Sequence, residues 1–208
     1  MNEKEEKMEP TEQYTSNEIT IGKWLNRGWD IVTSDLGNFV LLTLIYIIFL
    51  IALSFTVIGQ LLLSGPFTAG YFMIVFSKLR GKPFDIGDIS KAFNADVLIA
   101  SILAGILVST FITIGFFFLI IPGIILWAIY MFTFPLIVEQ KLNFWEAMET
   151  SRRIVSRNLF EFSIFAFVQL LLLLVGFLLI GAGLLFTIPL VMVATACAYE
   201  DIFGLASN

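Results

Sequence analysis

The chain has 208 residues, of which 58% are hydrophobic and only 14% charged, and its formal net charge is −5. A soluble domain carries about 25% charged residues, so this composition excludes an ordinary water-soluble protein and indicates residence in a lipid bilayer. The chain has no His and one Cys, which excludes Cys-His nucleophile pairs, His-ligated zinc sites and an internal disulfide. We therefore expect a protein that is not an enzyme and uses no cofactor or metal.

The first 20 residues are hydrophilic and acidic and lack an apolar core. A cleavable signal peptide requires such a core, so none is expected here. We interpret residues 1–20 as a disordered acidic tail and residues 21–208 as a single membrane domain.

Three long segments contain no charged residue: 36–77, 97–138 and 162–199. Each has about 40 residues, whereas one helix across ~30 Å of hydrocarbon needs about 20, so each segment fits two crossings. Gly and Pro residues near the middle of each segment predict a reversal of the chain there. These turn signals are Gly59 with Ser64-Gly65-Pro66, Gly115 with Pro122-Gly123, and Gly176 with Gly181 and Gly183.

These patterns predict an all-α, polytopic integral membrane protein with six transmembrane helices arranged as three hairpins. The expected helices are 39–59, 62–79, 97–117, 122–139, 160–179 and 183–199. The segments before and between the hairpins each have an apolar stripe at helical spacing, which is typical of an amphipathic helix lying along a membrane surface. In the last of them, Asn143 and Glu146 have the spacing of an N-cap and its capping-box partner. These cytoplasmic connector helices either brace the hairpins or recognise lipid.

The distribution of cations predicts which side of the membrane each loop occupies. All 12 Lys and Arg residues lie before or between the hairpins, and none lies in the three turns within them. Because basic residues beside short loops stay in the cytoplasm, both termini and the loops at 80–95 and 140–158 are expected to be cytoplasmic. The expected location is the cytoplasmic (inner) membrane.

The densest cationic cluster is formed by Arg152, Arg153 and Arg157. Arg153 and Arg157 are one helical turn apart, a spacing that allows their guanidinium groups to hold a lipid phosphate. Glu149 precedes Arg152 by three residues, so ordinary surface pairing is the alternative. The cluster is a candidate lipid-phosphate contact, although its role as a topology signal would account for it equally well.

Small side chains recur at every fourth position of the third predicted helix, at Ser101, Gly105, Ser109 and Thr113. Such a stripe lets two helix backbones approach closely within lipid. Its partner is either a helix of the same chain or a second copy of the protein.

Pro135 and Pro189 lie inside predicted crossings, where each removes a backbone hydrogen bond and predicts a kink. In lipid, the carbonyls released by a proline need partners such as the Thr133 or Thr187 hydroxyl, or they line a wet cavity. Helix packing explains both prolines as readily as a gate would. Glu139, four residues after Pro135, is interpreted as a residue of the helix end, since no ionisable group is predicted near the membrane midplane.

Five further segments carry a family resemblance: Gly65-Pro66-Phe67-Thr68-Ala69-Gly70, Leu79-Arg80-Gly81-Lys82-Pro83, Pro135-Leu136-Ile137-Val138-Glu139, Thr187-Ile188-Pro189-Leu190 and Ala198-Tyr199-Glu200-Asp201-Ile202-Phe203-Gly204. Together they resemble a group of uncharacterised prokaryotic membrane proteins related to the membrane domain fused to some glycerophosphodiester phosphodiesterases. The resemblance implies a six-helix membrane module. It transfers no catalytic residue, because the hydrolytic domain of the fused proteins has no counterpart in this sequence.

The leading functional hypothesis is a non-catalytic membrane module that organises lipid or assists a membrane partner. The alternative is a small channel or permease for an uncharged or amphiphilic solute, formed between kinked helices or at the centre of an oligomer. The expected partners are membrane lipids, anionic ones included, together with a second copy of the chain or another membrane protein. No nucleic-acid partner is expected.

Overall fold

The computed structural model describes residues 19–179 and 181–205. Residues 1–18 of the expected acidic tail lie outside this part of the chain. Over the described residues the chain forms helices joined by short turns, with no strand. In chain order the helices are α1 (Ile21–Ser34), α2 (Leu36–Ser54), α3 (Val57–Leu79), the 3₁₀ helix η1 (Ile86–Phe93), α4 (Ala95–Phe118), α5 (Ile120–Tyr130), α6 (Thr133–Gln140), α7 (Phe144–Val155), the 3₁₀ turn η2 (Ser156–Asn158), α8 (Leu159–Leu178) and α9 (Leu184–Phe203).

Six helical segments of the described chain are long and apolar enough to cross a membrane. Large apolar side chains stay exposed on them, including Ile48 at 57%, Phe117 at 86% and Phe160 at 74% exposure. Such side chains are costly in water and favourable in lipid. The all-α fold is thus confirmed for the described residues, and six segments have the length and composition of a multi-pass membrane protein. They are Leu36–Ser54, Gly59–Leu79, Ala95–Phe118, Ile120–Gln140, Phe144–Leu178 and Leu184–Phe203.

The breaks between α4 and α5 and between α8 and α9 lie where they were predicted, whereas the first predicted turn is wrong in its position. The chain reverses between α2 and α3 at Phe55 and Thr56 rather than at 59–62. Leu119, in an extended conformation, alone separates α4 from α5. Gly59, Gly65 and Gly115 therefore lie inside helices instead of ending them, as does Gly176 in α8.

The glycines inside these helices mark close contacts between helices. A Cβ atom built on Gly105 of α4 would lie 2.9 Å from the Cα of Gly65 in α3, and one on Gly183 would lie 2.8 Å from the Cα of Gly176. Real Cβ atoms do not approach backbone this closely, so these crossings need glycine because of contact rather than backbone conformation. This explains why glycines that normally indicate a turn, such as Gly65, Gly115 and Gly176, lie inside helices here.

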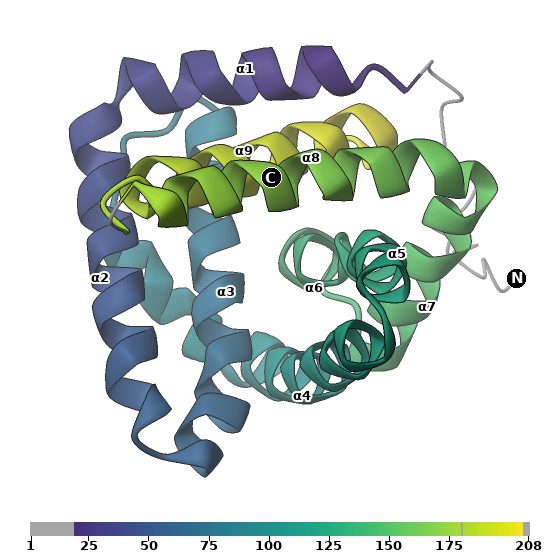
Figure 1. Cartoon of the computed structure of the whole chain (residues 1–208). Coiled ribbons are helices and arrows are strands. Elements are labelled where there is room, and N and C mark those ends of the chain that lie inside the picture. The colour runs from purple at the N-terminus through teal and green to yellow at the C-terminus, as the bar shows by residue number, and fades with distance from the viewer. Residues whose placement is uncertain (1–18, 180, 206–208) are drawn as a thin grey trace, which may run out of the picture.

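Consecutive long helices contact each other, but the pairs are not parallel. Contacts join α2 to α3, α4 to α5 and α8 to α9. In Figure 1 the α2–α3 pair runs vertically, α8 and α9 run across it, and α5 is seen almost end-on. The turns that join α2 to α3, α4 to α5 and α8 to α9 therefore point in different directions.

The amphipathic helix α1 lies along α9 in antiparallel orientation, as the top of Figure 1 shows. Near its start, the indole Nε1 of Trp24 donates a hydrogen bond of 2.7 Å to Asp201. Near its end, the rings of Trp29 and Phe186 are in edge-to-face contact with centroids 5.0 Å apart. The apolar stripe of α1 is thus buried in protein, at Trp24, Gly28 and Val32, and it braces α9.

The predicted crossing at 122–139, in which a kink was expected at Pro135, is interrupted just before this proline. The segment forms α5 and α6, separated by Met131 and Phe132 just before Pro135. Ser151 of α7 contacts this break: its hydroxyl donates to the Ile129 carbonyl at 2.6 Å and accepts from the Phe132 N–H at 3.3 Å. A buried hydroxyl from a neighbouring helix therefore replaces part of the lost helical hydrogen bonding.

Candidate functional site

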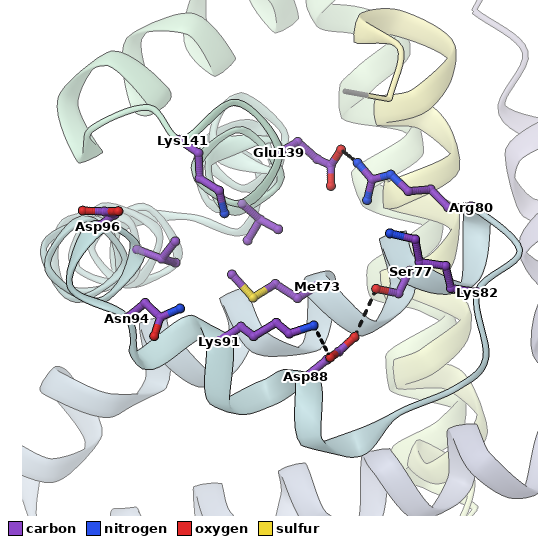
Figure 2. A pocket seen from close by; sticks show the side chains of 12 residues that line it. Met73, Ser77, Arg80, Lys82, Asp88, Lys91, Asn94, Asp96, Glu139 and Lys141 are labelled. Atoms are coloured by element: carbon purple, nitrogen blue, oxygen red, sulfur yellow. Dashed lines mark hydrogen bonds and ion pairs between the residues drawn. The ribbon is translucent and has the colours of Figure 1, made fainter. Parts of the chain in front are cut away.

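A polar pocket of about 330 Å³ opens where the C-terminal ends of α3 and α6 meet η1 and the first turn of α4. The loop after α3 contributes two of its residues, and the residue after α6 contributes another. The pocket, shown in Figure 2, is lined by Met73, Ser77, Arg80, Lys82, Asp88, Lys91, Asn94, Asp96, Val97, Val138, Glu139 and Lys141. Four of these side chains are cationic and three are carboxylates.

One wall of the pocket is an ion pair between Arg80 and Glu139. Arg80 follows the last residue of α3, and Glu139 is the penultimate residue of α6. The Glu139 side chain is only 3% exposed and that of Arg80 18% exposed. A buried carboxylate is strongly destabilising unless it is paired. The pair therefore joins the ends of two helices that are far apart in the sequence.

The opposite wall is formed by Asp88 of η1. Its carboxylate contacts the Lys91 ammonium at 2.5 Å and accepts a hydrogen bond of 3.3 Å from the Ser77 hydroxyl. The hydrogen bond from Lys91 to Asp88 raises the pKa of the Lys91 ammonium above its usual value, so this side chain stays charged. Just before η1, Asp85 accepts from the Gly87 N–H at 2.8 Å and caps the helix.

Lys82 and Lys141 complete the set of cations. Figure 2 shows their amino groups directed toward the interior of the pocket from opposite sides. Among the residues that the structure describes, neither has an acidic side chain within 4.0 Å, in contrast to Arg80 and Lys91. Lys141 also has a left-handed backbone conformation, with φ at 55°. A glycine would be less strained at this position.

The predicted arginine cluster lies elsewhere, on α7 and η2. The Arg152 guanidinium makes two hydrogen bonds to Glu149, of 2.6 and 2.9 Å, and Arg153 lies 4.0 Å from the same carboxylate. Hydrogen bonding from Arg152 lowers the pKa of the Glu149 carboxyl, which keeps it ionised. Arg157 follows the end of α7, in η2. Glu149 thus partly neutralises the cluster, and lipid-phosphate binding there stays a prediction.

The small-residue stripe of α4 divides into two halves. Ser101 and Gly105 are buried at the crossing with α3, opposite Gly65. Ser109 and Thr113 are exposed in the structure. The close contact of the stripe is therefore made within the chain, by its first half.

The two prolines differ in their surroundings. Pro135 is the third residue of α6, whereas α9 continues through Pro189. The Thr133 and Thr187 hydroxyls, expected as partners for released carbonyls, are buried and make no hydrogen bond within the described residues. Ser151, which the sequence analysis had not assigned this role, is the side chain that bonds to the interrupted backbone.

An apolar groove of about 520 Å³ lies between α5 and α8, apart from the polar pocket. Its walls are hydrocarbon except for the Ser163 hydroxyl, which donates to the carbonyl of Leu159 at 2.7 Å. The lining residues are Ile121, Ile124, Ile125, Leu159, Phe160, Ser163, Ile164 and Phe167.

Among the pocket residues, Glu139 was predicted to lie at a helix end, and nothing in the sequence pattern placed the others beside it. A usable signal was that Arg80 and Glu139, of opposite charge, follow apolar segments that end on the same predicted side of the membrane. No three His, Cys, Asp or Glu side chains converge to hold a metal ion within the described part of the chain. No protein-family model, curated protein or solved structure matches the sequence.

Proposed function

We propose that the chain is a non-catalytic module of the cytoplasmic membrane that organises lipid. In this proposal α2–α3, α4–α6 and α8–α9 form three membrane hairpins, and η1 and α7 are cytoplasmic connectors. Helix α1, expected as a further cytoplasmic connector, instead lies along α9 and enters the membrane beside it. Both termini and all the cations then lie on the cytoplasmic side. The motif resemblance to membrane domains fused to glycerophosphodiester phosphodiesterases leads us to propose a distant relationship to them as well.

The observation that supports lipid binding is the groove between α5 and α8. Its hydrocarbon walls have no hydrogen-bond donor free for a polar solute, because the Ser163 hydroxyl already donates to Leu159. Two apolar helices that diverge within a bilayer leave a gap that lipid chains fill, since an empty apolar cavity loses dispersion contacts. The groove thus fits one or more acyl chains of a membrane lipid.

The test is to fill the groove with a side chain. Ser163→Trp places an indole between α5 and α8, and we expect this variant to lose a lipid that the parent retains through purification. Leu171→Trp, on α8 and 42% exposed but outside the groove, is the matched control. Native mass spectrometry counts the bound lipids of each. Equal lipid retention by the parent and both variants would show that the groove holds no specific lipid.

A further inference from the structure

We infer that the polar pocket between α3, η1, α4 and α6 binds a singly charged phosphate group, either of a lipid headgroup or of a soluble phosphodiester. This inference rests on the proposed function only where the phosphate belongs to a lipid. It concerns different residues from the arginine cluster on α7 and from the apolar groove.

The charge of the pocket favours an anion. Two of its three carboxylates are already paired, Glu139 with Arg80 and Asp88 with Lys91. The third, Asp96, lies in the first turn of α4, where the helix N-terminus stabilises a negative charge. With four cations and three carboxylates, the pocket has a net charge of +1. A singly charged phosphodiester would balance this charge, whereas a doubly charged phosphate would leave an excess of negative charge beside Asp96.

Lys82 and Lys141 supply that charge. Their amino groups point into the same space from different elements, and no carboxylate of the described chain lies within 4.0 Å of either one. Two ammonium groups facing one pocket repel each other, and an anion between them is attracted to both and offsets this repulsion. Ammonium groups are also good point-charge partners for phosphate oxygens.

The size and position of the pocket fit a headgroup. One water takes about 30 Å³ in the liquid, so a volume of about 330 Å³ accommodates a polyatomic group. Apolar side chains of three membrane helices, Met73, Val97 and Val138, line the same pocket. A phosphate bound by the lysines would therefore have hydrocarbon beside it, as at the surface of a membrane.

The backbone of Lys141 provides a variant that separates binding from folding. Because φ at this position is positive, Lys141→Gly removes the amino group and relieves backbone strain at the same time. Weaker binding by this variant cannot be attributed to loss of the fold if its melting temperature is equal to or above that of the parent.

The experiment is a titration of the full-length protein in detergent with phosphatidylglycerol, followed by native mass spectrometry at matched ionic strength. Lys82→Gln/Lys141→Gln should bind this lipid about thirty-fold more weakly than the parent, since two basic contacts are lost. Lys141→Gly should bind about five-fold more weakly. Lys23→Gln/Arg27→Gln, which removes the same number of charges from α1, where both cations pair with acidic residues of α9, should bind within two-fold of the parent.

Competition with dimethyl phosphate distinguishes the two sources of the phosphate group. Displacement of the lipid by this soluble diester assigns the affinity to the phosphate, and resistance to displacement assigns the ligand to membrane lipid. Unchanged binding by the variant Lys82→Gln/Lys141→Gln, or a larger loss in the control variant Lys23→Gln/Arg27→Gln, would overturn the inference. Neither result depends on the groove, since Ser163→Trp tests the acyl-chain site separately.

Discussion

Ser151 is the residue on which the interrupted membrane segment depends most directly. Its hydroxyl bonds to both sides of the break between α5 and α6, and it is fully buried. Ser151→Ala would leave the Phe132 N–H and the Ile129 carbonyl without this partner. A buried polar group without a partner costs about 1–3 kcal/mol, so we expect the variant to be destabilised by that amount.

Thermal unfolding in detergent measures this effect, with Ser109→Ala as the control. The Ser109 hydroxyl also donates to a backbone carbonyl, that of Ile106, but it is exposed on α4. The same chemical change should have little effect there. If the two variants unfold at the same temperature, the hydroxyl of Ser151 does not stabilise the break.

Single residues were predicted well only where the interaction is local. The N-cap of α7 is confirmed, because the side-chain Oδ1 of Asn143 accepts from the Glu146 N–H at 3.0 Å, three residues away. The partner of Glu139 is 59 residues distant, at Arg80, and the partner of the Phe132 backbone is 19 residues distant. Sequence spacing within a helix cannot show which helix ends meet.

At the scale of whole helices, the crossing of α3 and α4 gives the sharpest test. A Cβ atom on Gly65 would clash with the carbonyl oxygen of Ser101, so Gly65→Ala should force the two backbones apart. Overpacking of this kind costs typically 1–3 kcal/mol or more. We expect a clear loss of thermal stability in detergent, and a change in the contacts between α3 and α4.

Gly37→Ala is the matched control, since Gly37 also lies in a helix but a Cβ atom there would meet nothing within 4 Å. Alanine is favoured over glycine within a helix by about 0.5–1 kcal/mol, so this variant should be slightly stabilised. A loss of thermal stability in Gly65→Ala together with a gain in Gly37→Ala would show that Gly65 is required by the close contact between α3 and α4. A neutral Gly65→Ala would contradict the close crossing.

The helices and two of their three reversals were predictable, whereas the reversal between α2 and α3 was not. Charge-free segments of twice the spanning length require a reversal, and the structure has one in each. The residues at the first two reversals, Phe55-Thr56 and Leu119, are apolar or β-branched and have no turn signature. In membrane proteins a glycine either permits a turn or permits two helices to pack closely. Gly65, Gly115 and Gly176 serve close helix packing.

For the molecule as a whole, the distribution of cations leads to a prediction of topology. Single cysteines are introduced at Thr56, Leu119 and Ala182 in the three turns, and at Ser90 and Glu146 in the connectors. The native Cys197 is buried, so it should not react with a membrane-impermeant reagent. In intact cells we expect the turn positions to be labelled and the connector positions to be protected until the membrane is opened.

Permeabilising the cells is also the control, because the introduced cysteine of each of the five variants should then react if it is exposed to water. Protection of the turns together with labelling of Ser90 or Glu146 in intact cells would reverse the proposed orientation. Labelling of only some turns would mean that not all three pairs cross the membrane, a result that the divergent directions of the pairs in Figure 1 make informative.

The pairing of α1 with α9 has a consequence for how the protein is assembled. Lys23 and its partner Asp201 are 178 residues apart in the chain, so α1 leaves the ribosome long before the helix that covers its apolar face. Until α8 and α9 are inserted, Trp24 lacks the rings of Phe162 and Phe165 as well as Asp201, and the membrane surface is the natural temporary location for such a helix. The surface-bound helix indicated by the sequence then belongs to the nascent chain, and the docking of α1 onto α9 is a late step of biogenesis.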